Sequence, residues 1–322
     1  MTNFQNGVSS YGVPLTGGGV PSTFGDVFFV DYRNGSDDNN GKSTKKAFKT
    51  LSKAYAKCTS NHNDLILIDG DSTVTETAMI DWSKNRIHVV GLNGVPSPLG
   101  YGNGAKVSLG VTTDATDIAT LKVTGVRNTF SNIKFQNSNT VDEGLYCVAE
   151  GGEYTRYFNC EFYKSTDLDE AGAAELLMNG DSSQFFNCTF GSGANAVTAD
   201  GARPCVLLNS LTITDKVCRD GAFVDCLFWR KAGDTDNSFV HAGDADDVVR
   251  MLLFKNCTFV NTTLAAQTMT VGISAAAALT QGEIILQNCT AYNVTNFATQ
   301  TGIFNASGAA NADNGGEVIQ AA

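Results

Sequence analysis

The sequence has few prolines, few charged residues for its length and no long apolar run. Its 322 residues include 5 Pro and 33 Gly, and 17% of them are charged. Because 42% are hydrophobic, the low charge does not indicate a disordered chain, and a sizeable core can form. An uninterrupted stretch of about 18 apolar residues, which a membrane-spanning helix needs, is missing. The composition predicts a folded, turn-rich chain that favours β-structure.

Positive charge is also scarce. The chain has 22 Lys+Arg against 33 Asp+Glu, which gives a formal net charge of −11. Binding to nucleic acid needs clustered cations that neutralise phosphates. The nearest approach to such a cluster is a group of lysines between Lys42 and Lys57, and we interpret it as the solvated face of a short helix. We therefore expect neither a nucleic-acid nor a membrane partner.

The amino-terminal residues lack the charged-then-apolar pattern of a signal peptide. They read Met1-Thr-Asn-Phe-Gln-Asn-Gly7, which is polar, so we expect synthesis in a cytoplasm. The nine cysteines form no CxxC or CxxH pair, and their odd number argues against a closed disulfide set. His62, His88 and His241 are far apart in sequence, so we expect no metal site and no cofactor.

A six-residue unit with an Asn-Cys-x-Phe core recurs along the chain. Its copies are Phe130–Phe135, Tyr157–Phe162, Phe185–Phe190, Phe223–Phe228, Phe254–Phe259 and Leu286–Ala291. The corner residues of successive copies lie 27, 28, 38, 31 and 32 residues apart, as in coils that carry external loops of variable length. Propeller blades need about 40 residues or more, and helical repeats need a 3.6-residue apolar period that is absent. The repeat therefore predicts coils of three short strands.

The residue types inside the unit explain how such coils stack. Asn and Asp tolerate the left-handed backbone conformation of a tight corner, and stacked coils about 4.8 Å apart would align them into a ladder. The following Cys and aromatic residue point the same way from the next strand, into the core. The predicted ladder comprises Asn132, Asn159, Asn187, Asp225, Asn256 and Asn288. The predicted file of buried thiols comprises Cys160, Cys188, Cys226, Cys257 and Cys289.

These patterns predict an all-β chain, a single-stranded right-handed parallel β-helix of about eight coils. Residues 1–25 read as an extended arm, and residues 26–62 as a strand at Val27–Asp31 followed by an amphipathic capping helix at Ser43–Lys57. The β-helix proper is predicted over residues 63–297, with Leu65–Asp69 and Ile87–Gly91 in its first two coils. Residues 298–322 would be a small-residue tail or a last loose coil.

A family resemblance rests on two segments and the repeat. The run Phe29-Val-Asp-Tyr-Arg-Asn-Gly-Ser-Asp-Asp-Asn-Asn-Gly-Lys-Ser43, then Ala47-Phe-Lys-Thr-Leu51 and the Asn-Cys-x-Phe coils, resembles the pectate-lyase-like β-helix superfamily as found in short phage virion proteins. The segment Asn6-Gly-Val-Ser-Ser-Tyr-Gly-Val-Pro-Leu-Thr-Gly-Gly18 is similar to amino-terminal arms of phage structural proteins. The superfamily includes polysaccharide lyases and hydrolases, glycan-cutting tailspikes and inert decoration or fibre proteins.

Candidate catalytic residues were sought on the outer ridge where β-helix enzymes act. Alignment on the cysteine file places Glu143, Glu150, Glu153, Asp181, His241 and Asp244 near it. Two carboxylates about 5 to 9 Å apart could hydrolyse a glycosidic bond, whereas a lyase would want a calcium ion and an Arg or Lys base. The motif set of polygalacturonase-type hydrolases is absent, and the ridge residues share no spacing. We therefore assign no catalytic residue.

One loop partly matches the sequence pattern of a calcium-binding loop. Asp37, Asn39 and Gly41 have the early ligand spacing of a calcium loop, but the bidentate Glu at its twelfth position is missing. We interpret the segment as a loop built on Asx turns, without metal.

The sequence favours a non-enzymatic phage virion protein, a capsid decoration or a head or neck fibre subunit, made in the host cytoplasm. Its arm would dock on major capsid or neck proteins through Phe4, Tyr11, Pro14 and Phe24, with the β-helix projecting outward, as a homo-oligomer and preferably a trimer. The alternative is a tailspike-like protein that cuts a host surface glycan or binds it without turnover.

Overall fold

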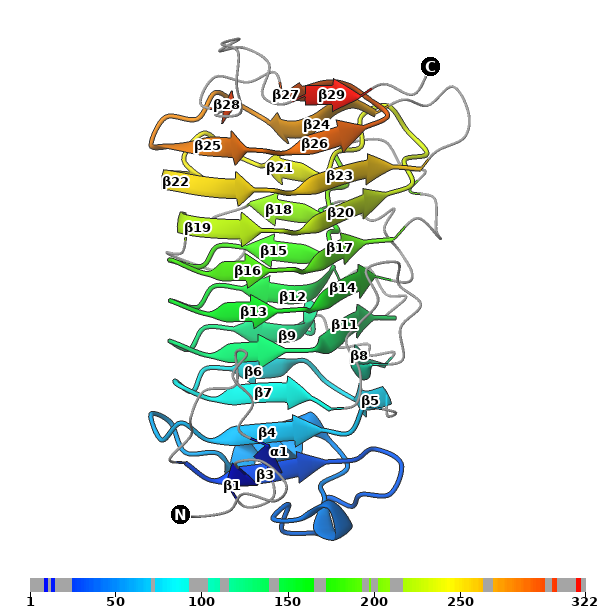
Figure 1. Ribbon diagram of the computed structural model, residues 1–322, viewed down its shortest axis with the longest axis vertical. Coiled ribbons are helices and arrows are strands. Elements are labelled where there is room, and N and C mark those ends of the chain that lie inside the picture. The colour runs from blue at the N-terminus through cyan, green and yellow to red at the C-terminus, as the bar shows by residue number, and fades with distance from the viewer. Residues whose placement is uncertain are drawn as a thin grey trace, which may run out of the picture.

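The structure, a computed structural model, describes residues 9–10, 13–14, 25–70, 73–92, 104–110, 116–138, 145–164, 172–192, 197, 202–208, 217–262, 269–298, 303–305 and 317–319. Within these ranges the chain is a parallel β-helix, whose strands stack as rungs from the amino-terminal to the carboxy-terminal end (Figure 1). No helix among them is long and apolar enough to cross a membrane.

Three parallel sheets form the walls of the β-helix. The first sheet contains ten strands: β3 (Val27–Val30), β4 (Leu65–Ile68), β7 (His88–Gly91), β10 (Thr129–Ser131), β13 (Arg156–Phe158), β16 (Gln184–Phe186), β19 (Cys218–Val224), β22 (Val248–Lys255), β25 (Gly282–Gln287) and β28 (Ile303–Asn305). The second contains nine: β5 (Thr73–Glu76), β8 (Ala105–Leu109), β11 (Ile133–Asn137), β14 (Glu161–Lys164), β17 (Thr189–Gly191), β20 (Leu227–Arg230), β23 (Thr258–Asn261), β26 (Thr290–Tyr292) and β29 (Glu317–Ile319).

The third sheet contains eight strands: β6 (Ile80–Trp82), β9 (Ala119–Val123), β12 (Tyr146–Glu150), β15 (Leu176–Met178), β18 (Val206–Leu208), β21 (Val240–Ala242), β24 (Met269–Ala275) and β27 (Val294–Ala298). The predicted all-β parallel β-helix is confirmed, and the number of coils differs slightly from the about eight predicted. The sequence patterns did not predict the short strands β5 and β6, which complete the earliest coils.

The corners between the first and second sheets have one backbone conformation. Asn132, Asn159, Asn187, Asp225, Asn256 and Asn288 all have φ between 51° and 57°. This left-handed region is strained for most residues, and Asn and Asp occupy it more readily. The side-chain amide of Asn187 donates to the Oδ1 atom of Asn159 at 2.7 Å, and that of Asn159 donates to Asn132 at 3.1 Å. The corner residues therefore both turn the chain and tie neighbouring coils together.

Stacked aromatic rings fill the interior. On the first sheet, the ring centroids of Tyr157 and Phe185 are 4.7 Å apart, and the next two pairs, Phe185–Phe223 and Phe223–Phe254, lie at 4.7 and 4.8 Å. A second stack from the second sheet meets the first edge-on. Such offset and edge-to-face contacts add stability beyond that of burying the rings.

All nine cysteines are buried free thiols. In the file that follows the corners, each Sγ atom lies near backbone carbonyl oxygens; that of Cys226, for example, is 3.5 Å from the Phe185 oxygen and 3.4 Å from the Val224 oxygen. A small thiol fits this narrow place beside the aromatic stack and serves as a weak donor.

The amino-terminal end of the core is closed by a short helix. The 3₁₀-helix η1 (Thr44–Lys46) and the helix α1 (Leu51–Lys57) replace the single helix predicted over Ser43–Lys57. The intervening residues are extended, because Phe48 forms a β-bridge with Val30. Buried side chains of α1 join the core, and the Tyr55 ring stacks on Trp82 at 4.0 Å.

The termini are described only in part. Strands β1 (Ser9–Ser10) and β2 (Val13–Pro14) form an antiparallel pair, which includes the backbone of Pro14. The other predicted docking residues, Phe4, Tyr11 and Phe24, lie outside the described residues. Of the predicted tail, residues 303–305 and 317–319 form β28 and β29.

Candidate functional site

The ridge residues that the sequence suggested do not form one site among the described residues. Glu143 lies outside them. Glu150 ends β12 but is fully buried, where its carboxyl group accepts hydrogen bonds from the Tyr157 hydroxyl at 2.5 Å, the Gly152 amide and the Ser183 hydroxyl. It binds two turns together and is out of reach of a substrate.

Two ridge carboxylates do lie on adjacent rungs. Glu153 and Asp181 are paired in a β-bridge, and Asp181 is bridged in turn to Arg219. The Asp181 carboxylate accepts a hydrogen bond from Ser182 at 2.9 Å and lies 3.4 Å from the Arg219 guanidinium. These contacts give Asp181 a structural role in the turn.

The last two ridge residues lie several coils away. His241 is on β21, with its Nδ1 atom 2.8 Å from the Ser274 hydroxyl, and burial lowers its pKa. Asp244 follows in an exposed turn, where its Oδ1 atom accepts from the Ala245 amide. Among the described residues, the predicted ridge therefore supplies no pair of free carboxylates facing a common cavity.

Burial governs the protonation of Glu150. Desolvation raises its pKa to about 7, although the hydrogen bonds from Tyr157, Gly152 and Ser183 act in the opposite direction. A carboxyl group without access to solvent that titrates near neutrality affects stability, not substrate chemistry.

A different cluster, rich in arginine, lines a cavity on the outer side of the first sheet. We call it the arginine pocket, and its volume is about 480 Å³. Its lining residues are Asn63, Arg86, His88, Arg127, Thr129, Tyr154 and Arg156. None of these described lining residues is acidic, in a chain whose net charge is −11.

The rungs of the β-helix position these side chains in two files. His88, Thr129 and Arg156 are direct cross-strand neighbours on β7, β10 and β13. They face outward because the next residue of each strand points into the core. Arg86, Arg127 and Tyr154 form the second file, two residues earlier in the turns, with φ values of 56°, 60° and 55°.

Hydrogen bonds between turns hold the second file in register. The Arg86 amide donates to the Val126 carbonyl, and the Arg127 amide donates to the Glu153 carbonyl. Each turn thus rests on the next one. The Arg127 guanidinium lies over the Tyr154 ring, 5.6 Å from its centroid, a distance suited to a cation–π contact.

The three guanidinium groups are not neutralised by the described carboxylates. Arg86, Arg127 and Arg156 form no ion pair with any carboxylate in the described part of the chain. Further along the same side, Arg219 pairs with Asp181, and Arg250 makes a two-pronged ion pair with Asp220. The positive charge of the arginine pocket is therefore local and available to a ligand.

His88 adds an unsatisfied polar group to the pocket. Its side chain is 6% exposed, and neither ring nitrogen has a hydrogen-bond partner in the described structure. Burial lowers its pKa to about 4, so the ring is neutral at pH 7 and offers one donor and one acceptor. Buried polar groups are normally paired, so water or a ligand in the cavity would supply the partners of this ring.

Sequence reasoning missed the arginine pocket because it searched for carboxylates. A usable signal was present in the repeat: Arg127 and Tyr154 each lie five residues before a corner Asn, and Thr129 and Arg156 lie three residues before it. Aligning those two columns places the side chains on one outer surface.

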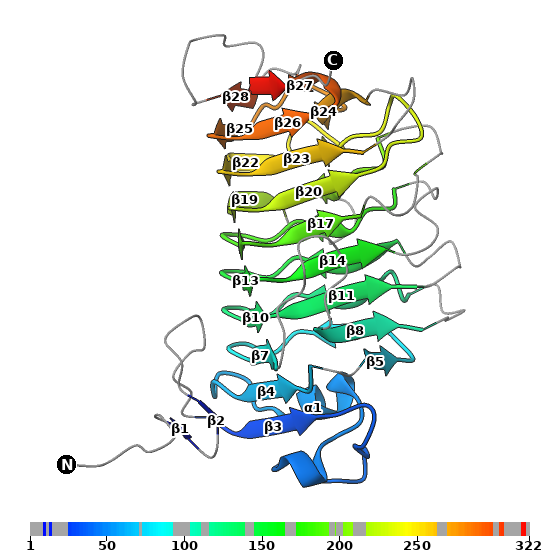
Figure 2. The ribbon, with the colours of Figure 1, turned by 45° about the vertical axis from the view of Figure 1, so that its right-hand side comes forward.

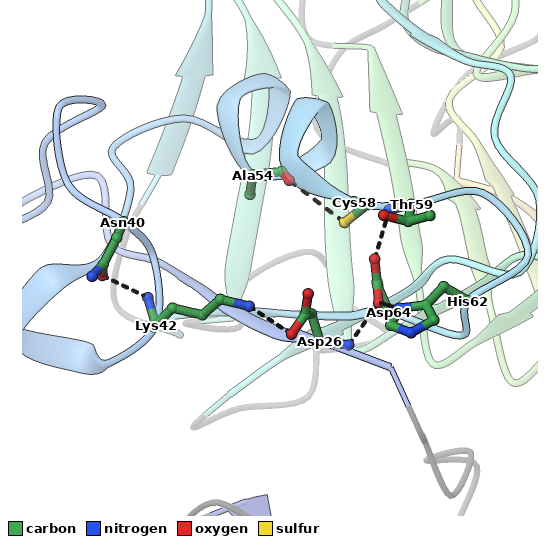
Figure 3. A network of polar contacts seen from close by, with 8 residues as sticks. All are labelled: Asp26, Asn40, Lys42, Ala54, Cys58, Thr59, His62 and Asp64. Carbon is green, nitrogen blue, oxygen red and sulfur yellow. Dashed lines mark hydrogen bonds and ion pairs between the residues drawn. The ribbon is translucent and has the colours of Figure 1, made fainter.

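A second cluster has the composition of a metal site. Ligand atoms of Asp26, His62 and Asp64 lie within 4.8 Å of one another (Figure 3). Asp64 is fully buried, and its oxygens accept from the Asp26 and Thr59 amides at 2.6 Å and contact the His62 Nδ1 atom. Lys42 lies 2.8 Å from the Asp26 carboxylate. The cluster's oxygens thus serve the packing of the first coil, and we assign no metal to it.

Comparisons with solved structures identify the fold. No family model and no curated protein sequence matches the chain. A pectate lyase, Pel9A, matches with a TM-score of 0.57 and 15% identity over 93% of this chain and 75% of its own. A rhamnogalacturonan lyase matches with a TM-score of 0.59 and 13% identity, covering 88% and 70%. The pectin methylesterase from carrot matches with a TM-score of 0.56 and 14% identity, covering 94% and 90%. The chain therefore has the parallel β-helix fold of pectate lyases and pectin methylesterases.

Proposed function

We propose that this β-helix protein binds an acidic glycan in the arginine pocket and does not cut it. The observation that carries the proposal is a group of three guanidiniums without a described carboxylate partner, which line one cavity together with the buried, unpaired ring of His88. The first anion to enter would supply the missing partners.

The residue types favour an anionic ligand. Guanidinium groups bind carboxylate, sulfate and phosphate through paired, charge-assisted hydrogen bonds. Because the net charge of −11 repels polyanions at long range, attraction must come from the pocket itself. Binding should therefore weaken steeply as salt screens the few charges involved.

The shape and the aromatic lining favour a sugar. A cavity of about 480 Å³ is within the range of small-molecule sites, and Tyr154, which lines it, is 50% exposed. An exposed aromatic face can cover the apolar side of a sugar ring. The fold neighbours are named as enzymes of pectate, pectin and rhamnogalacturonan.

The chemistry of the arginine pocket argues against cleavage. Hydrolysis needs two carboxylates about 5 to 9 Å apart, and the described lining contains none. A lyase would want a calcium ion held by carboxylates beside its Arg or Lys base, and the described lining offers no carboxylate for that ion. Binding without turnover is the function that these side chains support.

Calorimetric titration at low salt tests the proposal. Trigalacturonate should bind, and maltotriose, a neutral trisaccharide, should not. Arg127→Gln should weaken binding by about tenfold, whereas Arg250→Gln should not, because that guanidinium is occupied by Asp220. Equal affinity for both sugars would overturn the proposal. The appearance of new reducing ends or unsaturated sugars would overturn its non-catalytic part.

A virion location is a separate proposal, and it rests on the amino-terminal sequence. The arm would dock on capsid or neck proteins, and trimeric β-helices would present their pockets to a host surface glycan. Deleting residues 2–25 should prevent incorporation into particles while the β-helix stays folded. Normal incorporation of the truncated protein would contradict the docking role.

A further inference from the structure

We infer that the arginine pocket binds a polymeric acidic glycan parallel to the axis of the β-helix, with successive charged sugars facing successive rungs. This inference rests on the proposed function and adds the ligand's length and direction. The competing hypothesis is that the three arginines bind a single small anion, such as inorganic phosphate.

The first argument is the repeat of the cations along the axis. Arg86 and Arg127 occupy equivalent places in successive turns, and Arg156 lies on the next rung, beyond Thr129. Rungs are separated by about 4.8 Å, so the pocket extends over about 10 Å along the axis. A compact anion would contact one or two of these groups, whereas a chain with a charge on each sugar can reach all three.

The second argument is how the files end. On the rungs that follow Tyr154, the same turns carry Asp181 and Asp220, which hold the guanidiniums of Arg219 and Arg250. These carboxylates neutralise the next cations. The outer side therefore changes from unpaired to neutralised guanidiniums after three rungs, which limits the number of charged sugars that are bound.

The third argument is the unpaired ring of His88. It lines the same cavity as the three arginines, and neither of its nitrogens has a partner in the described structure. A bound sugar has hydroxyl groups that can both donate and accept, so it can satisfy both ring nitrogens, which an inorganic anion without a proton cannot do.

A length series provides the test. Galacturonate oligomers of one to five sugars would be titrated into the full-length protein by calorimetry, with inorganic phosphate as the single-anion probe. Affinity should rise about five- to tenfold with each sugar up to three and then level off. Arg156→Gln should remove the gain from the third sugar, whereas Arg250→Gln, a substitution outside the pocket, should leave the affinities of the whole series unchanged.

A gain-of-function variant sharpens the test. Asp181→Asn with Asp220→Asn frees the guanidiniums of Arg219 and Arg250 by removing the two carboxylates that hold them, so the fourth and fifth sugars should now increase affinity. These are partly exposed pairs, and melting curves would confirm that the fold persists. Equal affinity for one and three sugars, or for phosphate, would overturn the axial inference while the proposed function stood. Binding of no acidic sugar would overturn both.

Discussion

At the residue scale, the ladder of corner residues has one break. The side-chain amide of Asn256 donates to the Asp225 carboxylate at 3.0 Å, but no hydrogen bond joins the side chains of Asp225 and Asn187. Aspartate is an acceptor only, so it cannot donate to the Asn187 Oδ1 atom as an asparagine would. The chain therefore divides into two tied stacks of corners, one on each side of this step.

Asp225→Asn should close that break. The new amide can donate to Asn187 and keep its acceptor for Asn256, so the free energy of unfolding should rise by about 0.5 to 1 kcal/mol. Urea unfolding followed by circular dichroism measures the change. Asn159→Asp is the matched control, and it should lower stability because it removes the bond to Asn132. A lower midpoint for Asp225→Asn would contradict this account of the ladder.

The buried carboxyl group of Glu150 should make stability depend on pH. Its pKa is raised from 4.5 to about 7 in the folded state, so the folded protein holds this proton more tightly than the unfolded chain does. Stability is then lost as pH rises from about 4.5 to 7, by roughly 3 kcal/mol at most.

Glu150→Gln removes this titration. The difference in unfolding free energy, wild type minus variant, should fall across pH 4.5 to 7 and stay constant above it. Denaturant titrations at several pH values measure that difference. Tyr157→Phe removes a hydrogen bond that lowers the pKa, so the loss should extend to higher pH. A difference independent of pH would contradict the raised pKa.

The sequence predicted the positions that carry the same residue type in each coil, and it missed the site whose residue types differ from coil to coil. The corner and cysteine positions recur with fixed neighbours, so the sequence identified them directly. The arginine pocket consists of different residues at equivalent positions, Arg, then Arg, then Tyr, and its character appears once three rungs are superimposed. Glu150 was assigned to an outer ridge because a sequence alignment cannot show that its carboxyl group turns toward Tyr157.

At the element scale, the strands are held by their turns. Figure 2 shows the rungs stacked in chain order, and the tight corners lie where the first-sheet strands lead into the second-sheet strands. The apolar residues of segment 43–57 have helical spacing, which predicted one helix. Phe48 instead forms a β-bridge with Val30, so its backbone is extended and α1 begins only at Leu51.

Thr50 is the residue that begins α1. Its Oγ1 atom accepts from the Lys53 amide at 3.2 Å and donates to the Asp37 carboxylate at 3.0 Å. Thr50→Ala should cost about 1 to 2 kcal/mol, because the helix loses its cap and the loop at Asp37 loses a donor. Thr50→Ser should restore most of this loss. Equal stability of the two variants, measured by urea unfolding, would contradict the capping role.

At the scale of the whole molecule, a rigid β-helix carries a local positive site on an acidic body. The core of stacked aromatics and thiols keeps the rungs in register, and the rungs keep the arginine files in register. The fold is shared with enzymes that act on polysaccharides. In this chain, the arginines of the pocket, which have no described carboxylate partner, lie on the first sheet and in the turns that precede it. Position along the axis then decides whether an arginine is free or paired with aspartate.

The most direct test of this account is the binding of trigalacturonate to the variant Arg86→Gln, Arg127→Gln, Arg156→Gln. The substitutions remove three charges from exposed or half-buried side chains, so the variant should melt within a few degrees of the wild type. Its affinity should fall at least a hundredfold, and the salt dependence of binding should disappear with it. An affinity equal to that of the wild type would contradict the assignment of the arginine pocket as the functional site.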